Sequence, residues 1–129
     1  MTYLLDTDVV IDHLRKRQRL HDEVIATGCG ISMLSWGELA YGAQKSSFPE
    51  TSMAVVDDFL RENGVALVEL SREIMRAYAH ERARLEKKGE GLDQFDLLIA
   101  ATALAHSLIL VTRNTKHFSR IEGLRLAGE

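Results

Sequence analysis

Short apolar segments alternate with stretches of helical spacing along this chain, and no other feature restricts the fold as strongly. Each apolar segment is short enough for a buried strand. They cover residues 3–6, 29–33, 65–70, 108–112 and 124–127. Strands joined by helices pair in parallel, and the helices then cover both faces of the sheet. We therefore predict an α/β fold, a three-layer α/β/α sandwich around a central, mostly parallel sheet.

Capping residues indicate where several of the intervening helices begin and end. Ser35 is a candidate N-cap for a helix over residues 36–45. Ser71 is a candidate N-cap for a long helix that ends before Gly89. Further helices are predicted over residues 7–18, 20–27, 50–62 and 95–107.

Length and composition favour a single domain over residues 1–129, because 46% of the residues are hydrophobic and one sizeable core can form. No apolar run approaches the roughly 18 residues that span a membrane, and the N-terminus lacks a signal-like pattern. We expect a cytoplasmic protein whose one cysteine, Cys29, is a buried thiol. The net charge of −3 gives no overall attraction to nucleic acid, but cations bound at an acidic cluster can offset it locally.

Acidic residues interrupt or border the apolar segments at particular places. Asp6 ends the first strand, Glu38 lies early in the helix after the second, and Asp96 opens the apolar helix before residues 108–112. Thr112 and Asn114 lie where the 108–112 strand ends. Parallel sheets gather ligands at the carboxyl ends of their strands, so we expect these side chains to share one edge.

Three carboxylates at one edge raise each other's pKa, and a bound cation relieves their repulsion. Oxygen ligands without a histidine or cysteine cluster suit Mg²⁺ or Mn²⁺ better than zinc. Such an ion can activate water and stabilise a displaced phosphate oxygen. The sequence therefore predicts a metal site suited to phosphate chemistry.

The stretches "LLDTDVVID", "SWGELAYGAQ" and "FDLLIAATALAHSLILVTRNTKHFSRIEGL" together resemble a PIN domain, specifically the VapC-type toxin ribonucleases of bacterial toxin–antitoxin pairs. The resemblance runs from about residue 2 to the C-terminus. It implies a parallel α/β/α fold, a Mg²⁺- or Mn²⁺-dependent endoribonuclease activity, and a cognate antitoxin that blocks the site. It also implies that cleavage leaves a 3′-hydroxyl and a 5′-phosphate.

Carried over position by position, the family's acids fall on Asp6, Glu38 and Asp96, and Thr112 matches the hydroxyl residue that ends the last long strand. Asn114 stands where many PIN domains have a fourth acid, which makes one well-bound ion the expectation. We predict that Asp6 and Asp96 hold the ion and that Glu38 completes the acidic site. Thr112 and Asn114 would supply neutral hydrogen bonds to metal-bound water or to substrate.

Other acids near these positions have competing interpretations. Asp8 stands where the family usually has Asn or Ser, and it fits a first-turn acid that interacts with the helix dipole as well as a ligand. Asp12 is expected to be solvated. Asp93 is the main rival of Asp96 for the ligand position.

Two basic groups are candidates for RNA contact. Arg113 and Lys116, with His117 and Arg120, follow the 108–112 strand and are predicted to contact substrate. Four cations near the end of the first helix fit a solvated face or a surface that steers RNA phosphates. They are Arg15, Lys16, Arg17 and Arg19.

A surplus of large apolar residues on short helices, together with the resemblance, predicts a homodimer that also binds an antitoxin. The residues are Trp36, Leu39, Tyr41, Phe59 and Leu60. Trp36, Tyr41 and Phe95 are interpreted as packing or interface residues rather than base-stacking platforms.

Two other functions also fit the sequence. "LLDTDVV" also fits a haloacid-dehalogenase-type phosphatase with Asp6 as nucleophile, although "LILVTRNTK" provides no clear lysine or late acidic pair for it. A non-catalytic PIN-like module that represses through its antitoxin is the other alternative.

Overall fold

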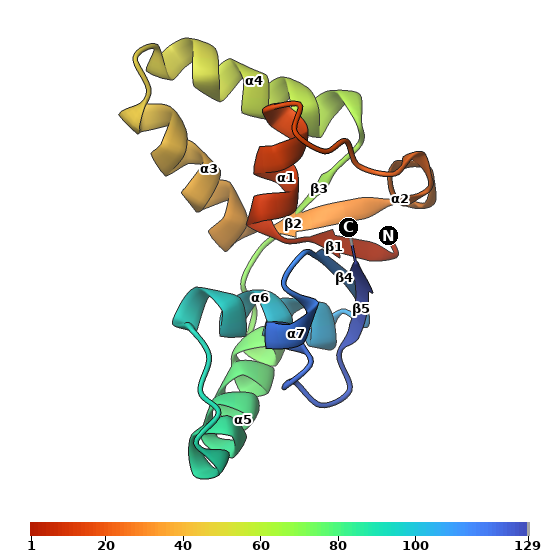
Figure 1. Cartoon of the computed structure of the whole chain (residues 1–129), viewed down its shortest axis with the longest axis vertical. Helices are drawn as coiled ribbons and strands as arrows, with labels where there is room; N and C mark the ends of the chain where they lie inside the picture. The colour runs from red at the N-terminus through yellow and green to blue at the C-terminus, as the bar shows by residue number, and fades with distance from the viewer. Residues whose placement is uncertain (129) are drawn as a thin grey trace.

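Five parallel strands form one central sheet in the order β3-β2-β1-β4-β5, with β1 in the middle (Figure 1). The computed structural model describes residues 1–128. The predicted α/β/α fold is confirmed. The strands are β1 (Tyr3–Leu5), β2 (Cys29–Ser32), β3 (Ala66–Val68), β4 (Ile109–Thr112) and β5 (Arg125–Gly128).

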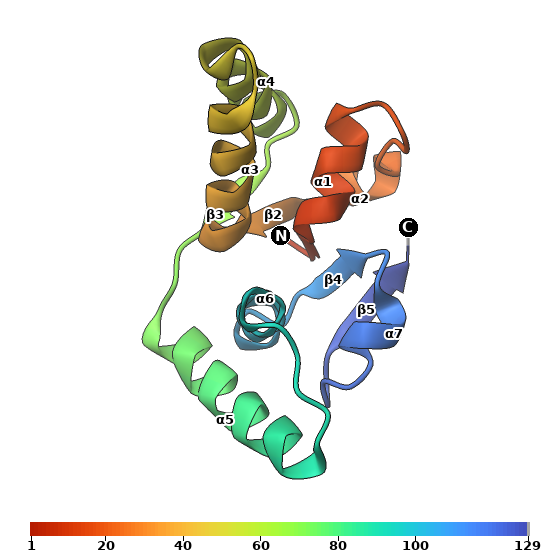
Figure 2. The same ribbon diagram turned by 60° about the vertical axis from the view of Figure 1, so that its left-hand side comes forward.

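Helices cover both faces of this sheet. The first group is α1 (Thr7–Leu14), α2 (Asp22–Thr27), α3 (Met33–Lys45) and α4 (Pro49–Glu62). The second group is α5 (Arg72–Lys88), α6 (Gln94–Ala105) and α7 (Thr115–Phe118). Figures 1 and 2 show the two groups on opposite sides of the strands. Within the described chain, no helix combines the length and apolar character needed to cross a membrane.

Alternation along the central strands divides the core into two layers. Leu4 and Leu110 pack into the cluster beneath α5 and α6, whereas Leu5 and Val111 pack into the cluster beneath α1 to α4. Cys29 is a free, buried thiol in the second cluster, as expected. Both faces of β1 and β4 are therefore buried, and only the ends of these strands can present polar groups.

Helix α1 is shorter than predicted. It ends at Leu14 because Lys16 takes a positive φ of 58° and turns the chain. The backbone N–H groups of Arg17 and Gln18 then donate to the carbonyl of Asp12. The basic segment that follows is consequently a loop folded back against the end of α1.

The cap of α3 also differs from the prediction. Ser32, not Ser35, is the N-cap, and its hydroxyl accepts a hydrogen bond from the Leu34 N–H at 3.1 Å. Both serines fit the capping pattern in sequence, but the strand ends at Ser32 and the helix starts at once. Ser71 and Gly89 bound α5 as predicted, and Gly89 takes the left-handed conformation at φ 68°. The four-residue helix α7 was not predicted.

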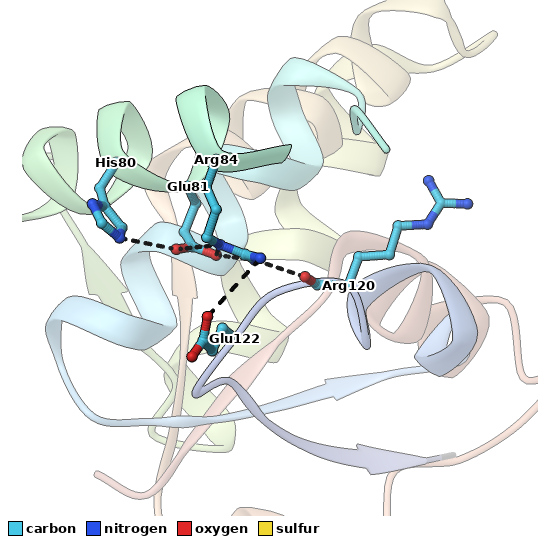
Figure 3. A network of polar contacts seen from close by, with 5 residues as sticks. All are labelled: His80, Glu81, Arg84, Arg120 and Glu122. Carbon is cyan, nitrogen blue, oxygen red and sulfur yellow. Dashed lines mark hydrogen bonds and ion pairs between the residues drawn. The ribbon is translucent and has the colours of Figure 1, made fainter. Parts of the chain in front are cut away.

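A network of polar contacts around Glu81 and Arg84 ties α5 to the loop between α7 and β5 (Figure 3). Glu81 is buried and accepts from Arg84, with a shortest distance of 2.7 Å. Arg84 also donates to the carbonyl of Arg120 at 2.8 Å, and Glu122 lies 4.0 Å from its guanidinium. The Arg120 guanidinium in turn donates to the carbonyl of Gly91. Arg120, predicted to contact substrate, is thus engaged in holding loops together.

The apolar residues expected to form an interface are mostly core residues. Leu39 and Phe59 are buried, and Trp36 and Leu60 pack against the same cluster, so this part of the prediction is wrong. Only Tyr41 is largely exposed, at 63%. The other exposed large hydrophobic side chains are Met1, Phe48, Val55, Leu67, Leu70, Met75 and Phe95.

Candidate active site

The carboxylate of Asp6 lies at the carboxyl end of β1, where it also caps α1. It is 7% exposed. Its Oδ1 accepts from the Thr7 N–H at 2.9 Å, and its Oδ2 accepts from the Thr112 hydroxyl at 2.8 Å. Burial raises the pKa of Asp6, and the two hydrogen bonds oppose that shift. Capping and metal binding are compatible, because each carboxylate oxygen can accept more than one partner.

Register places Thr112 opposite Asp6 across the sheet. Leu5 of β1 pairs with Val111 of β4, and the Asp6 N–H donates to the Val111 carbonyl at 2.9 Å. Thr112 is fully buried, and its hydroxyl both donates to Asp6 and accepts from the Asn114 N–H at 3.0 Å. The prediction assigns this hydroxyl to metal-bound water or substrate, whereas in the structure it donates to the carboxylate of Asp6.

Glu38 reaches the same edge from α3, and Thr7 holds it there. The Thr7 hydroxyl donates to Glu38 Oε1 at 2.7 Å and lies 2.9 Å from the Ser35 hydroxyl. Thr7 and Ser35 are both buried. Sequence reasoning missed both residues as parts of the site. The only available signals were the position of Thr7 beside Asp6 and that of Ser35 one turn before Glu38.

Asp96 completes the acidic group from the first turn of α6. Burial raises its pKa to about 6, and the charges of Asp6, Asp93 and Glu38 act in the same direction. His117 opposes the shift. Within residues 1–128, no hydrogen bond or ion pair reaches the Asp96 carboxylate. Asp6, Glu38 and Asp96 thus lie close enough for their charges to act on one another, although Glu38 and Asp96 come from helices α3 and α6.

The donor set suits a hard divalent ion. It consists of carboxylates and hydroxyls, and two of the carboxyl groups have raised pKa values that a nearby cation would lower. In the described part of the chain, no three His, Cys, Asp or Glu side chains already converge as a metal-binding group. The fit therefore rests on the chemistry of Asp6, Asp96 and Glu38 and on their mutual repulsion.

The other acidic and amide candidates have different partners. Asp93 caps α6, where its Oδ2 accepts from the Phe95 N–H at 3.1 Å, and it is exposed. Asp8 is an exposed acid in the first turn of α1. The Asn114 side chain contacts Nδ1 of His117 at 2.9 Å. Asp93 and Asn114 therefore remain neighbours of the acidic group, without a contact to Asp6 or Asp96.

The expectation that Asp12 is solvated is wrong. Its side chain is only 13% exposed and pairs with the guanidinium of Arg113. A second cation, Arg17, lies 3.5 Å from its other oxygen. Lys116, the other predicted RNA contact, is exposed on α7. The rim of the candidate site thus carries a basic group on the side of β4.

Comparisons with known proteins show the family to which the chain is related. Residues 3–124 match the family model described as PIN domain. The sequence is 32% identical over 128 residues to ribonuclease VapC2 of Haemophilus influenzae, covering 97% of this chain and 96% of that protein. It is 31% identical to the tRNA(fMet)-specific endonuclease VapC of Shigella flexneri, with the same coverage of both chains.

The fold of this chain is also similar to that of solved structures. The chain is similar to one in the crystal structure of VapBC2 from Rickettsia felis bound to a DNA fragment from its promoter. The TM-score is 0.89 at 32% identity, covering 100% of this chain and 99% of that one. A chain of DNA-bound VapBC from Salmonella typhimurium gives a TM-score of 0.91 at 29% identity, covering 99% and 98%.

Proposed function

Because this chain belongs to the PIN-domain family, we propose that it is a metal-dependent endoribonuclease and the toxin of a toxin–antitoxin pair. The observation that carries the proposal is the state of Asp96. Its carboxyl group has a pKa raised to about 6 beside Asp6 and Glu38, and no described residue bonds to it. A half-buried carboxylate that lies beside two other acids and accepts no hydrogen bond from the described residues fits a site that works with a cation. The RNA substrate would place its action in the cytoplasm.

Asp6 and Asp96 would hold Mg²⁺ or Mn²⁺, and Glu38 would complete the acidic site. When bound, the ion would supply Lewis-acid activation of water and stabilise negative charge on the phosphate. The chain's own residues fix the geometry. Thr112 orients Asp6 through its hydroxyl, and this bond favours the ionised carboxylate that a cation requires.

Thr7 supports Glu38 in the same way. Its hydroxyl engages Oε1 at 2.7 Å, which leaves Oε2 available to accept a proton or to orient a water molecule. Thr7 directly follows Asp6 in the sequence, so this bond also links Glu38 to the neighbourhood of Asp6. We propose that Glu38 orients the attacking water and that Thr7 sets the direction of its carboxylate.

The names of the relatives support an antitoxin partner, since their solved structures are VapBC complexes. A groove of about 250 Å³ between α1, α3 and α4 offers a place for it. Leu14, Leu39 and Val56 supply apolar lining, and Glu38 lies at the same groove. We propose that a segment of the antitoxin binds there and thereby covers the acidic site.

A homodimer is the second proposed assembly. Leu67, Leu70 and Met75 are exposed around β3 and the start of α5, away from the α1–α3–α4 groove. A dimer would cover such apolar side chains. Light scattering at micromolar concentration tests this, and a Leu70→Glu variant should shift the protein to monomer if that surface is the interface. A monomeric wild-type chain would contradict it.

Cleavage of end-labelled RNA by the purified chain tests the proposed activity. Cleavage should require Mg²⁺ or Mn²⁺, stop with chelator, and disappear in Asp6→Asn while the variant keeps its fold by circular dichroism. Mapped products should end in a 3′-hydroxyl and a 5′-phosphate. Absence of metal-dependent cleavage by the folded wild-type chain on a transfer-RNA pool would count against the proposal.

A further inference from the structure

One ion-pair cluster at the rim is unaccounted for by the metal chemistry. Asp12 of α1 stands between two arginines, Arg113 at the end of β4 and Arg17 in the loop after α1. The carboxylate is 13% exposed, whereas the side chain of Arg113 is 31% exposed and that of Arg17 is 62% exposed. The acid is therefore covered, while both cations face solvent.

The cluster adjoins the candidate active site through the backbone. Arg113 directly follows Thr112, whose hydroxyl is bonded to Asp6. Asp12 lies in the helix that Asp6 caps. The Arg113 guanidinium is thus linked to Asp6 in two ways. One link runs through the neighbouring residue Thr112, and the other runs through Asp12 and helix α1.

The loop that carries Arg17 has a defined path. The carbonyl of Asp12 accepts from the Arg17 N–H at 2.9 Å, and Nδ1 of His13 accepts from the Leu20 N–H at 3.0 Å. These two bonds fold the basic segment of residues 15–19 back over the end of α1. Arg17 is consequently brought beside Asp12 by the backbone as well as by charge.

The charges of Asp12, Arg113 and Arg17 do not cancel, so this cluster can bind an anion. Two guanidinium groups meet one carboxylate, so the cluster has a net positive charge of one. A guanidinium carries five N–H donors, and contact with Asp12 uses only part of the Arg113 fork. A carboxylate that fixes the side chain also reduces the conformational entropy lost when a phosphate binds.

We propose that Arg113 and Arg17, positioned by Asp12, form a subsite for a phosphate of the RNA backbone beside the bond to be cut. Arg113 and Arg17 are the substrate-binding residues, and Asp12 is a positioning residue. The subsite rests on the proposed ribonuclease function for its substrate class. It would hold a neighbouring phosphodiester while the acidic edge acts on the scissile one.

Direct RNA binding tests the subsite without cleavage. Fluorescence anisotropy with a short labelled single-stranded RNA is measured on the Asp96→Asn chain without metal, over a range of salt concentrations. Arg113→Ala should weaken binding about tenfold near 0.1 M salt. It should also reduce the slope of log affinity against log salt by about 0.7, the value for one phosphate contact on a single strand. An unchanged slope would overturn the proposal.

Asp12→Asn is the most discriminating variant. Loss of a negative charge alone and loss of arginine positioning predict opposite changes in RNA affinity. Removal of a negative charge alone should tighten RNA binding, as expected of the control Asp57→Asn, an exposed acid of α4. If Asp12 positions the arginines, Asp12→Asn should weaken binding about threefold or more. Asp12→Glu should restore most of the affinity. Binding that tightens as in the control would overturn the role of Asp12.

A double variant and kinetics separate positioning from simple folding effects. In an Arg113→Ala background, Asp12→Asn should no longer weaken binding, since the side chain it positions is gone. In the active chain, Asp12→Asn should raise KM with little change in kcat. A lower melting temperature with unchanged KM would mean a purely structural tie and overturn the proposal. Wild-type chain that binds RNA but never cleaves it would instead contradict the proposed function alone.

Discussion

The hydroxyl of Thr112 donates a hydrogen bond to Oδ2 of Asp6 at 2.8 Å, although the two residues lie 106 positions apart. The contact joins the carboxyl ends of the two central strands. Burial raises the pKa of Asp6, and this hydrogen bond opposes the rise without cancelling it. A neutral side chain therefore favours the ionised form of Asp6, which the proposed metal site requires.

Thr112→Val tests this bond while preserving the shape of the side chain. Loss of the donor raises the pKa of Asp6 further, so a smaller fraction is ionised at acid pH. The acid limb of the pH–activity profile should move to higher pH, and activity near neutral pH should fall about tenfold or more. Thr112→Ser should retain the wild-type profile. Identical pH profiles for wild type and Thr112→Val would contradict the role given to the bond.

Asp96→Asn should abolish RNA cleavage and relieve growth arrest caused by expression, while making the metal-free protein more stable. The pKa of Asp96 is raised from 3.8 to about 6, so its ionised form destabilises the folded state. This cost is present above pH 6 and disappears as the pH falls toward 4. The gain in melting temperature should therefore be largest above pH 6 and shrink below it.

Melting curves without metal across pH 4 to 8 check this expectation. Asp57→Asn serves as the matched control, because it removes an exposed carboxylate that lies outside the acidic group. A folded Asp96→Asn variant with full activity, or with a stability gain that grows as the pH falls, would rule out the assignment.

Thr7→Val removes the hydrogen bond that directs Glu38 while keeping a side chain of similar volume. The carboxylate of Glu38 loses its donor at 2.7 Å, and kcat should fall about tenfold with KM nearly unchanged. Thr7→Ser keeps the hydroxyl and should stay close to wild type. Steady-state kinetics decide the matter, and equal kcat values for Thr7→Val and wild type would place Glu38 outside the chemistry.

Asn114→Asp adds a negative charge at the end of β4, next to the hydroxyl that serves Asp6. We expect Mn²⁺ to bind severalfold more tightly, because an added charge near a divalent ion is attracted strongly even at an effective dielectric near 20. Calorimetric titration measures affinity and stoichiometry. Gln44→Glu on α3 makes the same chemical change at an exposed position and should leave both unchanged. No difference between the two variants would place Asn114 away from the ion.

Patterns in the sequence were enough to predict the alternation of strands and helices and the parallel α/β/α fold. Matches over nearly the whole chain confirm the PIN-domain resemblance. Periodicity and strand ends carry this information locally, because parallel strands present their last residues at a common edge. Asp6, Glu38 and Asp96 could be proposed for that reason.

The contacts between polar side chains follow from the three-dimensional fold and could not be predicted from local sequence. The bonds from Thr112 to Asp6 and from Thr7 to Glu38 join separate elements, and no local pattern encodes such a pair. Asp12 was expected to be solvated, yet Arg113, which directly follows β4, pairs with its carboxylate. Pairing across the sheet fixes these contacts, and the energy of a charge depends on what the fold places beside it.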